Sequence, residues 1–335
     1  MWSKKRIEEA QTVNIELPTI ATDFLDYMGT IRGKSQNTVT AYTYDLILFF
    51  KYIKIRRGIV PQGTELDEIS IADIDAYYMQ NVSIGDFYSF LSFVANSRDN
   101  KNSARARKVA CLRSFFKYLH KMRLIDENPA LELETPKLNS RQPIHLTLEE
   151  SKKLLSNVDG EFKERDYAII TLFLNCGMRL SELVGIDMDK INGDVLTVIG
   201  KGNKERTVYL NNACLEAIKS YLKVRPVDGV KDKKALFLSE RKQRISKRTV
   251  QYIVKKYIEG AGLDGDKYST HKLRHTAATL MYKYGKVDIR ALQEILGHEN
   301  ISTTQIYTHI DDDSLRQAIK ANPLSDEFEE NKEVP

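Results

Sequence analysis

Hydrophobic residues in the first third of the chain recur at the three-to-four-residue spacing of amphipathic helices. The first such run covers residues 20–31 and stops before Gly33; its apolar positions are Ile20, Phe24, Leu25, Met28 and Ile31. A second helix is predicted over residues 37–55, with an apolar side made of Tyr42, Leu46, Phe49, Phe50 and Ile53 and a positive end made of Lys51, Lys54, Arg56 and Arg57. Weaker helical patterns cover residues 71–81 and 84–95, and a longer one covers residues 103–123, with an apolar stripe of Leu112, Phe115, Phe116, Leu119 and Met122.

Residues 128–144 contain three prolines and little periodicity, which predicts an extended connector. We therefore divide the chain into a helical domain over residues 1–138 and a second domain over residues 139–335. The second domain opens with a capping box from Thr147 to Glu150, and further helices are predicted over residues 166–175, 213–223, 247–259, 272–284 and 289–296. The segments VLTVIG and RTVYL flank KGNKE and predict a hairpin with Lys201 and Lys204 at its turn. The expected fold class is mainly α with a small β-sheet.

Cysteine usage and motif content exclude several classes of protein. Cys111, Cys176 and Cys214 are far apart in sequence, form no CxxC pair and sit in apolar segments, which favours a reducing cytoplasm, buried thiols and no metal site. The N-terminus lacks the apolar run of a signal peptide, and no later stretch approaches the roughly 20 apolar residues that cross a bilayer. The sequence has neither a GxxxxGK phosphate loop nor a dinucleotide fingerprint. We expect a cytoplasmic protein that contacts no membrane and uses no cofactor.

The charge is unevenly distributed. The whole chain carries +5, but residues 309–335 hold eight acids and three bases, so the remaining residues carry 48 bases and 38 acids, or +10. A basic body favours a polyanionic partner such as nucleic acid. The helix over residues 103–123 presents Arg105, Arg107, Lys108, Arg113, Lys117 and Lys121 largely off its apolar stripe. The pattern alone fits either a solvated basic face or a surface that contacts phosphates.

Five segments of the second domain carry candidate chemistry: CGMRLSEL, IGKGNKER, STHKLRH, LGHEN and TTQIYTH. Their order and spacing resemble the tyrosine recombinase (phage integrase) family, and the nearly continuous match over the last ~190 residues is most similar to the Xer-type members. The segment NTVTAYTYDLILFFKYI extends this resemblance into the first domain. It implies an N-terminal SAM-like core-binding domain that contacts DNA and a C-terminal α+β catalytic domain.

The residue types in these segments also suit cleavage of a phosphodiester. Planar guanidinium groups can stabilise the negative charge that develops on the non-bridging oxygens in the transition state. The resemblance implies Arg179 and Arg274 as these groups. Taken alone, Arg179 fits a contact with a helix-end carbonyl equally well, and Arg274 fits a surface ion pair. Tyr307 is the implied nucleophile, and a phenol of pKa about 10 needs a proton acceptor, for which the resemblance favours His271.

The remaining roles rest on the same resemblance. His298 would hydrogen-bond the phosphate or align the tyrosine, and Lys201 would protonate the departing 5′ oxygen, with Lys204 as its rival. Glu182 would support the arginine pocket, whereas His275 is expected to pack behind Arg274 without a chemical step.

The expected activity is therefore metal- and ATP-independent cleavage and rejoining of duplex DNA through a 3′-phosphotyrosine and a Holliday junction. Four subunits would assemble on two sites, either as a homotetramer or with a second recombinase, and the segment after Tyr307 would dock into a neighbouring subunit. Xer-type chromosome-dimer resolution, with a possible DNA translocase as partner, is the favoured task. The alternatives are an integrase or excisionase of a mobile element and a type IB topoisomerase.

Overall fold

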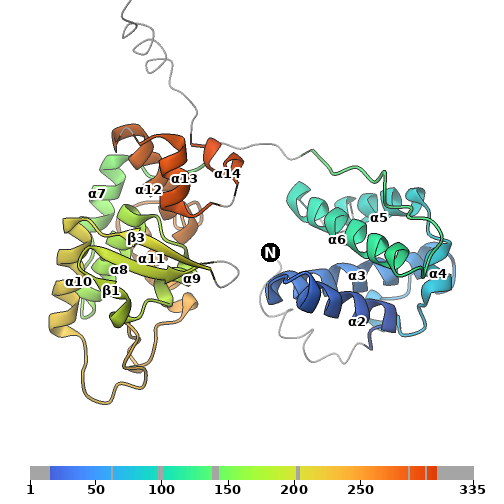
Figure 1. The fold of residues 1–335 in the computed structure, drawn as a ribbon, viewed down its shortest axis with the longest axis horizontal. Coiled ribbons are helices and arrows are strands. Elements are labelled where there is room, and N and C mark those ends of the chain that lie inside the picture. The colour runs from blue at the N-terminus through green and yellow to red at the C-terminus, as the bar shows by residue number, and fades with distance from the viewer. Residues whose placement is uncertain are drawn as a thin grey trace, which may run out of the picture. The chain divides into compact units, whose positions relative to one another are not determined.

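The computed structural model describes residues 16–61, 63–96, 98, 101–137, 143–200, 204–285, 287–298 and 300–307. The chain divides into two compact units, Met1–Ser140 and Arg141–Pro335, each with its own hydrophobic core (Figure 1). The described part of the first unit is helical, and the second adds one three-stranded sheet to its helices. The predicted fold class, mainly α with a small β-sheet, is confirmed. No helix in the described ranges has both the length and the apolar character needed to cross a membrane.

The first unit is built around a cluster of phenylalanines. Its elements are α2 (Thr19–Asp26), a π-helical turn η1 (Tyr27–Ile31), α3 (Gln36–Arg56), η2 (Leu66–Glu68), α4 (Ala76–Gln80), α5 (Ile84–Asn96) and α6 (Asn102–Lys121). Helix α3 begins where the side chain of Ser35 accepts a hydrogen bond from the Thr38 amide. The fully buried rings come from α2, α3, α5 and α6, and several pack edge to face: Phe24, Phe49, Phe50, Phe87, Phe90, Phe115 and Phe116.

Two apolar positions of the first unit lie outside this core, contrary to the sequence prediction. Ile31 is 72% exposed and Met122 is 52% exposed. Ile31 ends the π-helical turn, in which the Arg32 amide bonds to the carbonyl five residues back, at Tyr27. This wider turn shifts later side chains off the buried face of α2. Met122 follows the last residue of α6, where the chain leaves the helix.

Part of the predicted basic surface of the first unit is internal. Asp45 on α3 is 1% exposed and pairs with Arg107 and with Lys108 of α6, and Lys108 is itself buried. Because charges are costly to bury unless they are paired, this cluster fixes α3 against α6. The end of α3 is likewise partly neutralised, by pairs of Lys54 with Asp73 and of Arg56 with Asp86.

The second unit places its sheet against a bundle of helices. Its elements are α7 (Leu148–Ser156), α8 (Lys163–Cys176), α9 (Leu180–Val184), η3 (Met188–Lys190), β1 (Ile191–Asn192), β2 (Val195–Ile199), β3 (Glu205–Tyr209), α10 (Asn212–Val224), α11 (Lys247–Gly260), α12 (Thr270–Gly285), α13 (Ile289–Leu296) and α14 (Ser302–Gln305). The predicted capping box is present, since Thr147 and Glu150 exchange backbone and side-chain hydrogen bonds of 2.7 and 3.1 Å. The predicted hairpin is the antiparallel pair β2–β3, in which Leu196 lies opposite Val208.

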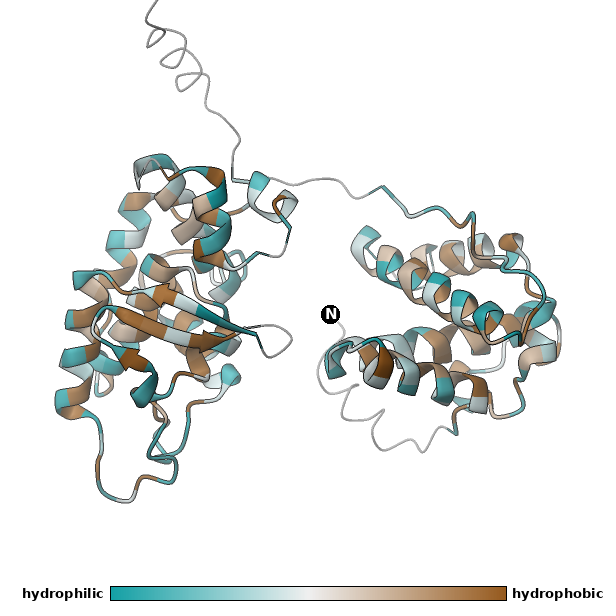
Figure 2. Cartoon of the chain, viewed as in Figure 1, coloured by the Kyte–Doolittle hydropathy of each residue, from teal (hydrophilic) through white to brown (hydrophobic). Residues whose placement is uncertain are grey.

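Helix α8 forms the centre of this unit, where it packs against α10 and α12. Residues 168–174 of α8 are all buried, which accounts for their nearly continuous apolar sequence AIITLFL. Other helices alternate hydrophobic and hydrophilic positions around their circumference, as Figure 2 shows. The three cysteines are buried free thiols, as predicted, but Cys176 and Cys214 are spatial neighbours, with their sulfur atoms 3.5 Å apart where α8 meets α10.

Candidate active site

The candidate residues of the second unit gather where four segments of the chain meet. Arg179 is the N-cap residue of α9, Arg274 lies on α12, His298 follows α13, and Tyr307 follows α14. The turn from α8 to α9 requires Gly177, which has a left-handed φ of 57°. A Cβ at Gly177 would also come within 2.9 Å of the Leu296 side chain, so a larger residue would separate α8 from α13.

Arg274 is buried and fixed by main-chain carbonyls. Its exposed fraction is 3%, and it donates hydrogen bonds of 2.7 Å to the carbonyl of Gly177 and 2.7 Å to that of Leu296. Burial, followed by the charge of nearby Arg179, lowers the pKa of Arg274 to about 10. The side chain therefore remains charged at neutral pH.

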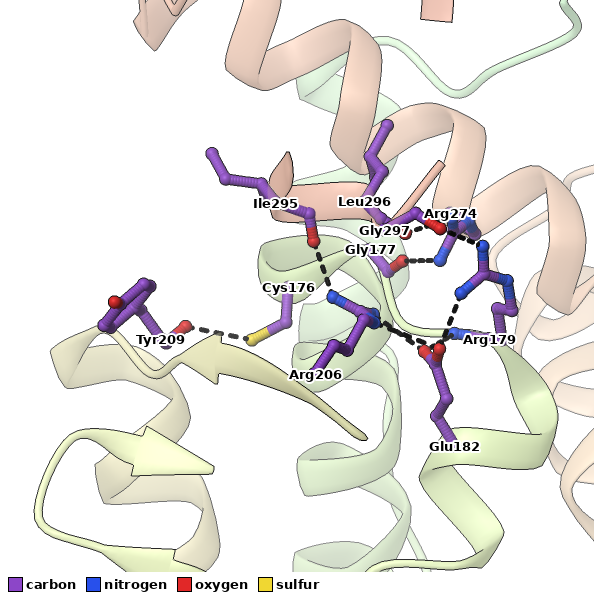
Figure 3. Close-up of polar contacts among 10 residues, drawn as sticks. All are labelled: Cys176, Gly177, Arg179, Glu182, Arg206, Tyr209, Arg274, Ile295, Leu296 and Gly297. Atoms are coloured by element: carbon purple, nitrogen blue, oxygen red, sulfur yellow. Dashed lines mark hydrogen bonds and ion pairs between the residues drawn. The ribbon is translucent and has the colours of Figure 1, made fainter. Parts of the chain in front are cut away.

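Arg179 lies beside Arg274, and both side chains donate to carbonyls at the end of α13. The Arg179 side chain donates to Glu182 Oε1 at 2.8 Å and to the carbonyl of Gly297 at 2.6 Å, while its backbone amide donates to Glu182 Oε2 at 2.7 Å (Figure 3). The two guanidinium groups are thus held in place within one cationic pocket, although like charges repel. Each leaves donors outside these bonds that an anion could engage.

A third arginine, which the sequence did not single out, completes this network. Arg206 on β3 donates to Glu182 Oε1 at 3.0 Å, to Glu182 Oε2 at 2.7 Å and to the carbonyl of Ile295 at 2.6 Å (Figure 3). Glu182 is 1% exposed. Burial would raise the pKa of Glu182, but hydrogen bonds and charge from Arg206 and Arg179 hold it below its ordinary value. Glu182 is therefore a carboxylate shared by two arginines.

Tyr307 contacts a histidine other than the one the sequence favoured. The Tyr307 hydroxyl lies 2.6 Å from Nδ1 of His275, and the tyrosine is 5% exposed. Burial raises the pKa of Tyr307 to about 12, while burial followed by the charge of His271 lowers the pKa of His275 to about 4. At neutral pH a protonated phenol therefore donates to a neutral imidazole. The prediction that His275 would only pack behind Arg274 did not anticipate this contact.

The other two histidines differ in their surroundings. His271 is exposed, and its ring packs edge-on against that of His275 at a centroid distance of 4.5 Å. His298 Nδ1 lies 2.9 Å from the hydroxyl of buried Thr304 on α14, and burial followed by the charge of Arg274 lowers its pKa to about 4. His298 thereby links the end of α13 to the short helix that precedes Tyr307.

The lysine position is described only in part. Lys201 lies outside the described residues, and Lys204 is exposed immediately before β3, where its carbonyl accepts a 2.7 Å bond from the Gly200 amide. The choice between the two lysines stays a prediction. Within the described ranges, no group of three or more His, Cys, Asp or Glu side chains is arranged to hold a metal ion.

Comparisons with known proteins match both units. The profile of the phage integrase family covers residues 145–314, and that of the phage integrase N-terminal SAM-like domain covers residues 21–122. Tyrosine recombinase XerC of Caldanaerobacter subterraneus subsp. tengcongensis is 61% identical over 97% of this chain and 93% of its own length. Tyrosine recombinase XerD of Proteus mirabilis is 34% identical over 89% of this chain and 90% of its own.

Solved structures agree on the fold. The XerH site-specific recombinase bound to its palindromic difH substrate superposes with a TM-score of 0.69 and 22% identity, over 90% of this chain and 84% of that one. Near-full-length identity of 61% to a curated relative, together with profiles that match both units, shows the relationship that the five motifs predicted. The chain belongs to the phage integrase family of tyrosine recombinases, among its Xer-type site-specific members.

Proposed function

We propose that this recombinase cuts and rejoins duplex DNA through a covalent bond between the Tyr307 hydroxyl oxygen and a backbone phosphate. The observation that carries this proposal is the position of Tyr307. The tyrosine packs in one apolar cluster with Leu296, whose carbonyl fixes Arg274. The nucleophile and the cationic pocket therefore both pack against the end of α13. As the bond from Tyr307 to phosphorus forms, the bond from phosphorus to the 5′ oxygen breaks and leaves a 3′-phosphotyrosine.

Arg179 and Arg274 are proposed to hold the phosphate. Both are charged and pre-positioned by fixed partners, so little reorganisation is needed when negative charge grows on the non-bridging oxygens. His298 is proposed to donate to the same phosphate or to keep Tyr307 aligned, and its bond to Thr304 supports the second role.

The phenol proton has two candidate acceptors. His271 is the acceptor that the sequence implies, whereas His275 is the imidazole in contact with the hydroxyl. We propose that His275 receives the proton first, because general-base catalysis needs an acceptor within hydrogen-bond reach. Lys201 is proposed to protonate the departing 5′ oxygen, with Lys204 as the rival on the same hairpin. A 5′ hydroxyl from a second strand then attacks the phosphotyrosine, which releases Tyr307 and forms the Holliday junction.

This route is proposed to need neither metal nor ATP, because the phosphotyrosine conserves the energy of the broken bond. The first domain, residues 1–138, is proposed to bind DNA with the catalytic domain, residues 139–335. We propose a tetramer on two sites, formed by four copies or with a second recombinase, and subunit exchange through the segment after Tyr307, which lies outside the described residues.

Cytoplasmic chromosome-dimer resolution, with a possible DNA translocase as partner, is the proposed task, because the relatives of 61% and 34% identity are named XerC and XerD. Movement of a mobile element is the second candidate and relaxation of supercoils the third. The test is deletion of the gene from its host. Accumulation of unseparated chromosomes in dividing cells after the deletion would support chromosome-dimer resolution.

The test of the chemistry uses a nicked suicide substrate that traps the covalent intermediate. The parent should form an adduct on it, and Tyr307→Phe should bind the same DNA without forming one, because only the attacking oxygen is lost. Adduct formation by the Phe variant would assign attack to another tyrosine.

A further inference from the structure

Three successive carbonyls at the end of α13 each accept a hydrogen bond from a different arginine. The Ile295 carbonyl accepts from Arg206 at 2.6 Å, that of Leu296 from Arg274 at 2.7 Å and that of Gly297 from Arg179 at 2.6 Å. Two of these arginines belong to the proposed phosphate pocket. The third, Arg206, has no role in the chemistry proposed above, yet it shares Glu182 with Arg179 and bonds the carbonyl next to the one that holds Arg274.

Arg206 also neutralises the carboxylate that would otherwise compete for Arg179. Glu182 has no side-chain exposure and is bonded by Arg206 through both oxygens, while it accepts from Arg179 through one side-chain bond and one backbone bond. Without Arg206, an almost unsolvated carboxylate would have Arg179 as its remaining cationic partner in this network. The attraction between them would then strengthen, and Arg179 would have less positive charge to offer a phosphate.

Close packing fixes the place of the Arg206 side chain. Gly297 has a left-handed φ of 61°, and a Cβ built there would lie 2.6 Å from Cδ of Arg206. Arg206 is 12% exposed through its side chain, so its stem fills the space beside this glycine. The residue after Gly297 is His298, which means that Arg206 supports the turn on which another proposed active-site residue sits.

Arg206 further connects this turn to the hairpin. It lies on β3, opposite Val198 of β2, and in the sequence these strands flank the segment that contains the two candidate lysines. One guanidinium therefore joins the hairpin, the carboxylate behind Arg179 and the end of α13.

We propose that Arg206 is a positioning residue of the recombination reaction: it neutralises Glu182 and holds the end of α13, so that Arg179 and His298 are aligned on the scissile phosphate. This inference rests on the proposed role of Arg179 in phosphate binding.

The experiment compares Arg206→Met with Arg165→Met. Arg165 is a matched control because its side chain is 7% exposed against 12% for Arg206, pairs with Asp166 and donates to the Leu238 carbonyl, and because it has no partner among the described residues of the site. Single-turnover adduct formation is measured at saturating DNA, together with DNA affinity and melting temperature. We expect Arg206→Met to lower the cleavage rate roughly 10–10²-fold, in line with a small misplacement of reacting groups, while affinity changes little. Arg165→Met should lose comparable stability without this loss of rate. Equal losses of rate in both variants would show that Arg206 has only a structural role and would overturn the proposal.

A second readout depends on charge rather than on stability. If Arg206 acts by neutralising Glu182, then adding Glu182→Gln to Arg206→Met removes the uncompensated carboxylate, and the double variant should cleave no more slowly than Arg206→Met alone. Independent roles would instead make the two losses multiply, and that result would overturn the proposal.

A third measurement separates this inference from the proposed function. In a crystal structure of Arg206→Met, the bonds of Arg179 to Glu182 and Gly297 should rearrange, whether or not the protein forms a covalent adduct. Unchanged bonds would overturn the positioning role. A parent protein that forms no adduct at Tyr307 would instead overturn the proposed function, and the positions of Arg179 and α13 in the variant would still test the inference.

Discussion

Replacing His275 by Ala tests which imidazole receives the proton of Tyr307. The hydroxyl and Nδ1 are 2.6 Å apart, with the pKa of Tyr307 near 12 and that of His275 near 4. Complete proton transfer in the resting state is thus uphill by about eight pKa units, or roughly 11 kcal/mol. The proton should move only as the bond to phosphorus forms, since esterification removes the basicity of the phenolate. His275 would then act as a general base, a role commonly worth about 10²–10⁴-fold in rate.

The pH profile of single-turnover cleavage distinguishes this mechanism from loss of the proton to solvent. His275 is already neutral above about pH 4, so its contribution to the parent rate should be flat between about pH 5 and 9. In His275→Ala, attack would depend on the ionised phenol, a fraction of about 10⁻⁵ at pH 7 for a pKa near 12. The variant should therefore be slower by about 10²–10⁴-fold at pH 7, and its rate should rise nearly tenfold per pH unit.

His271→Ala is the matched control, because His271 lies one turn away on the same helix and its ring contacts that of His275. The His271→Ala variant should retain the flat pH profile of single-turnover cleavage. If His271→Ala gives the steep profile while His275→Ala keeps the parent rate, the acceptor is His271 and the resting contact of Tyr307 is not the catalytic one.

The remaining predictions concern the pocket, the lysine, the cofactors and acid stability. Arg274→Ala should lower cleavage by about 10²–10³-fold at saturating DNA, and a loss confined to binding would contradict its role on the phosphate. Lys201→Ala should be slow on ordinary DNA but recover when sulfur replaces the 5′ oxygen, because a thiolate leaves without a proton; recovery by Lys204→Ala instead would exchange the two roles. Strand cleavage should persist in EDTA without ATP, and a strict need for a divalent ion in the cleavage step would refute the metal-free route. The pKa values of His275 and His298 lie near 4, below the ordinary 6.5, so the unfolded chain gains protons first. The melting temperature should fall as the pH drops from about 6.5 to 4. Because both rings are only partly buried, the loss should be well below the roughly 3 kcal/mol per histidine that the full shift would give. A melting temperature that does not change over this pH range would show that the two pKa values are not depressed.

The sequence predicted what depends on local pattern and motif. It placed the helix over residues 289–296 at its observed bounds, and it singled out Arg179, Arg274 and Tyr307, all three of which contact the end of α13. It missed Arg206, because an arginine in a strand carries no sign that a buried carboxylate 24 residues away will pair with it.

The other differences between sequence and structure have the same physical origin. The sequence does not predict the contact of His275 with Tyr307, because it joins α12 to a segment 32 residues later and side-chain periodicity carries no information on such long-range contacts. The sequence predicts Arg107 and Lys108 of α6 as surface charges because Asp45, the partner of both, lies on another helix. Ile31 was expected in the core because a π-helical turn cannot be told from an α-helix by apolar spacing.

The bonds of Arg274 to main-chain carbonyls affect how easily the pocket can bind a phosphodiester. Both are neutral main-chain dipoles, at Gly177 and Leu296, and neither belongs to an acid. An incoming phosphodiester would not have to displace a carboxylate from this arginine or leave one unpaired. The full unit charge of Arg274 stays available, while Arg179 shares its charge with Glu182. Because every residue has a carbonyl, the side chain at position 296 can vary in other members without removing this anchor, provided that it still fits against Gly177.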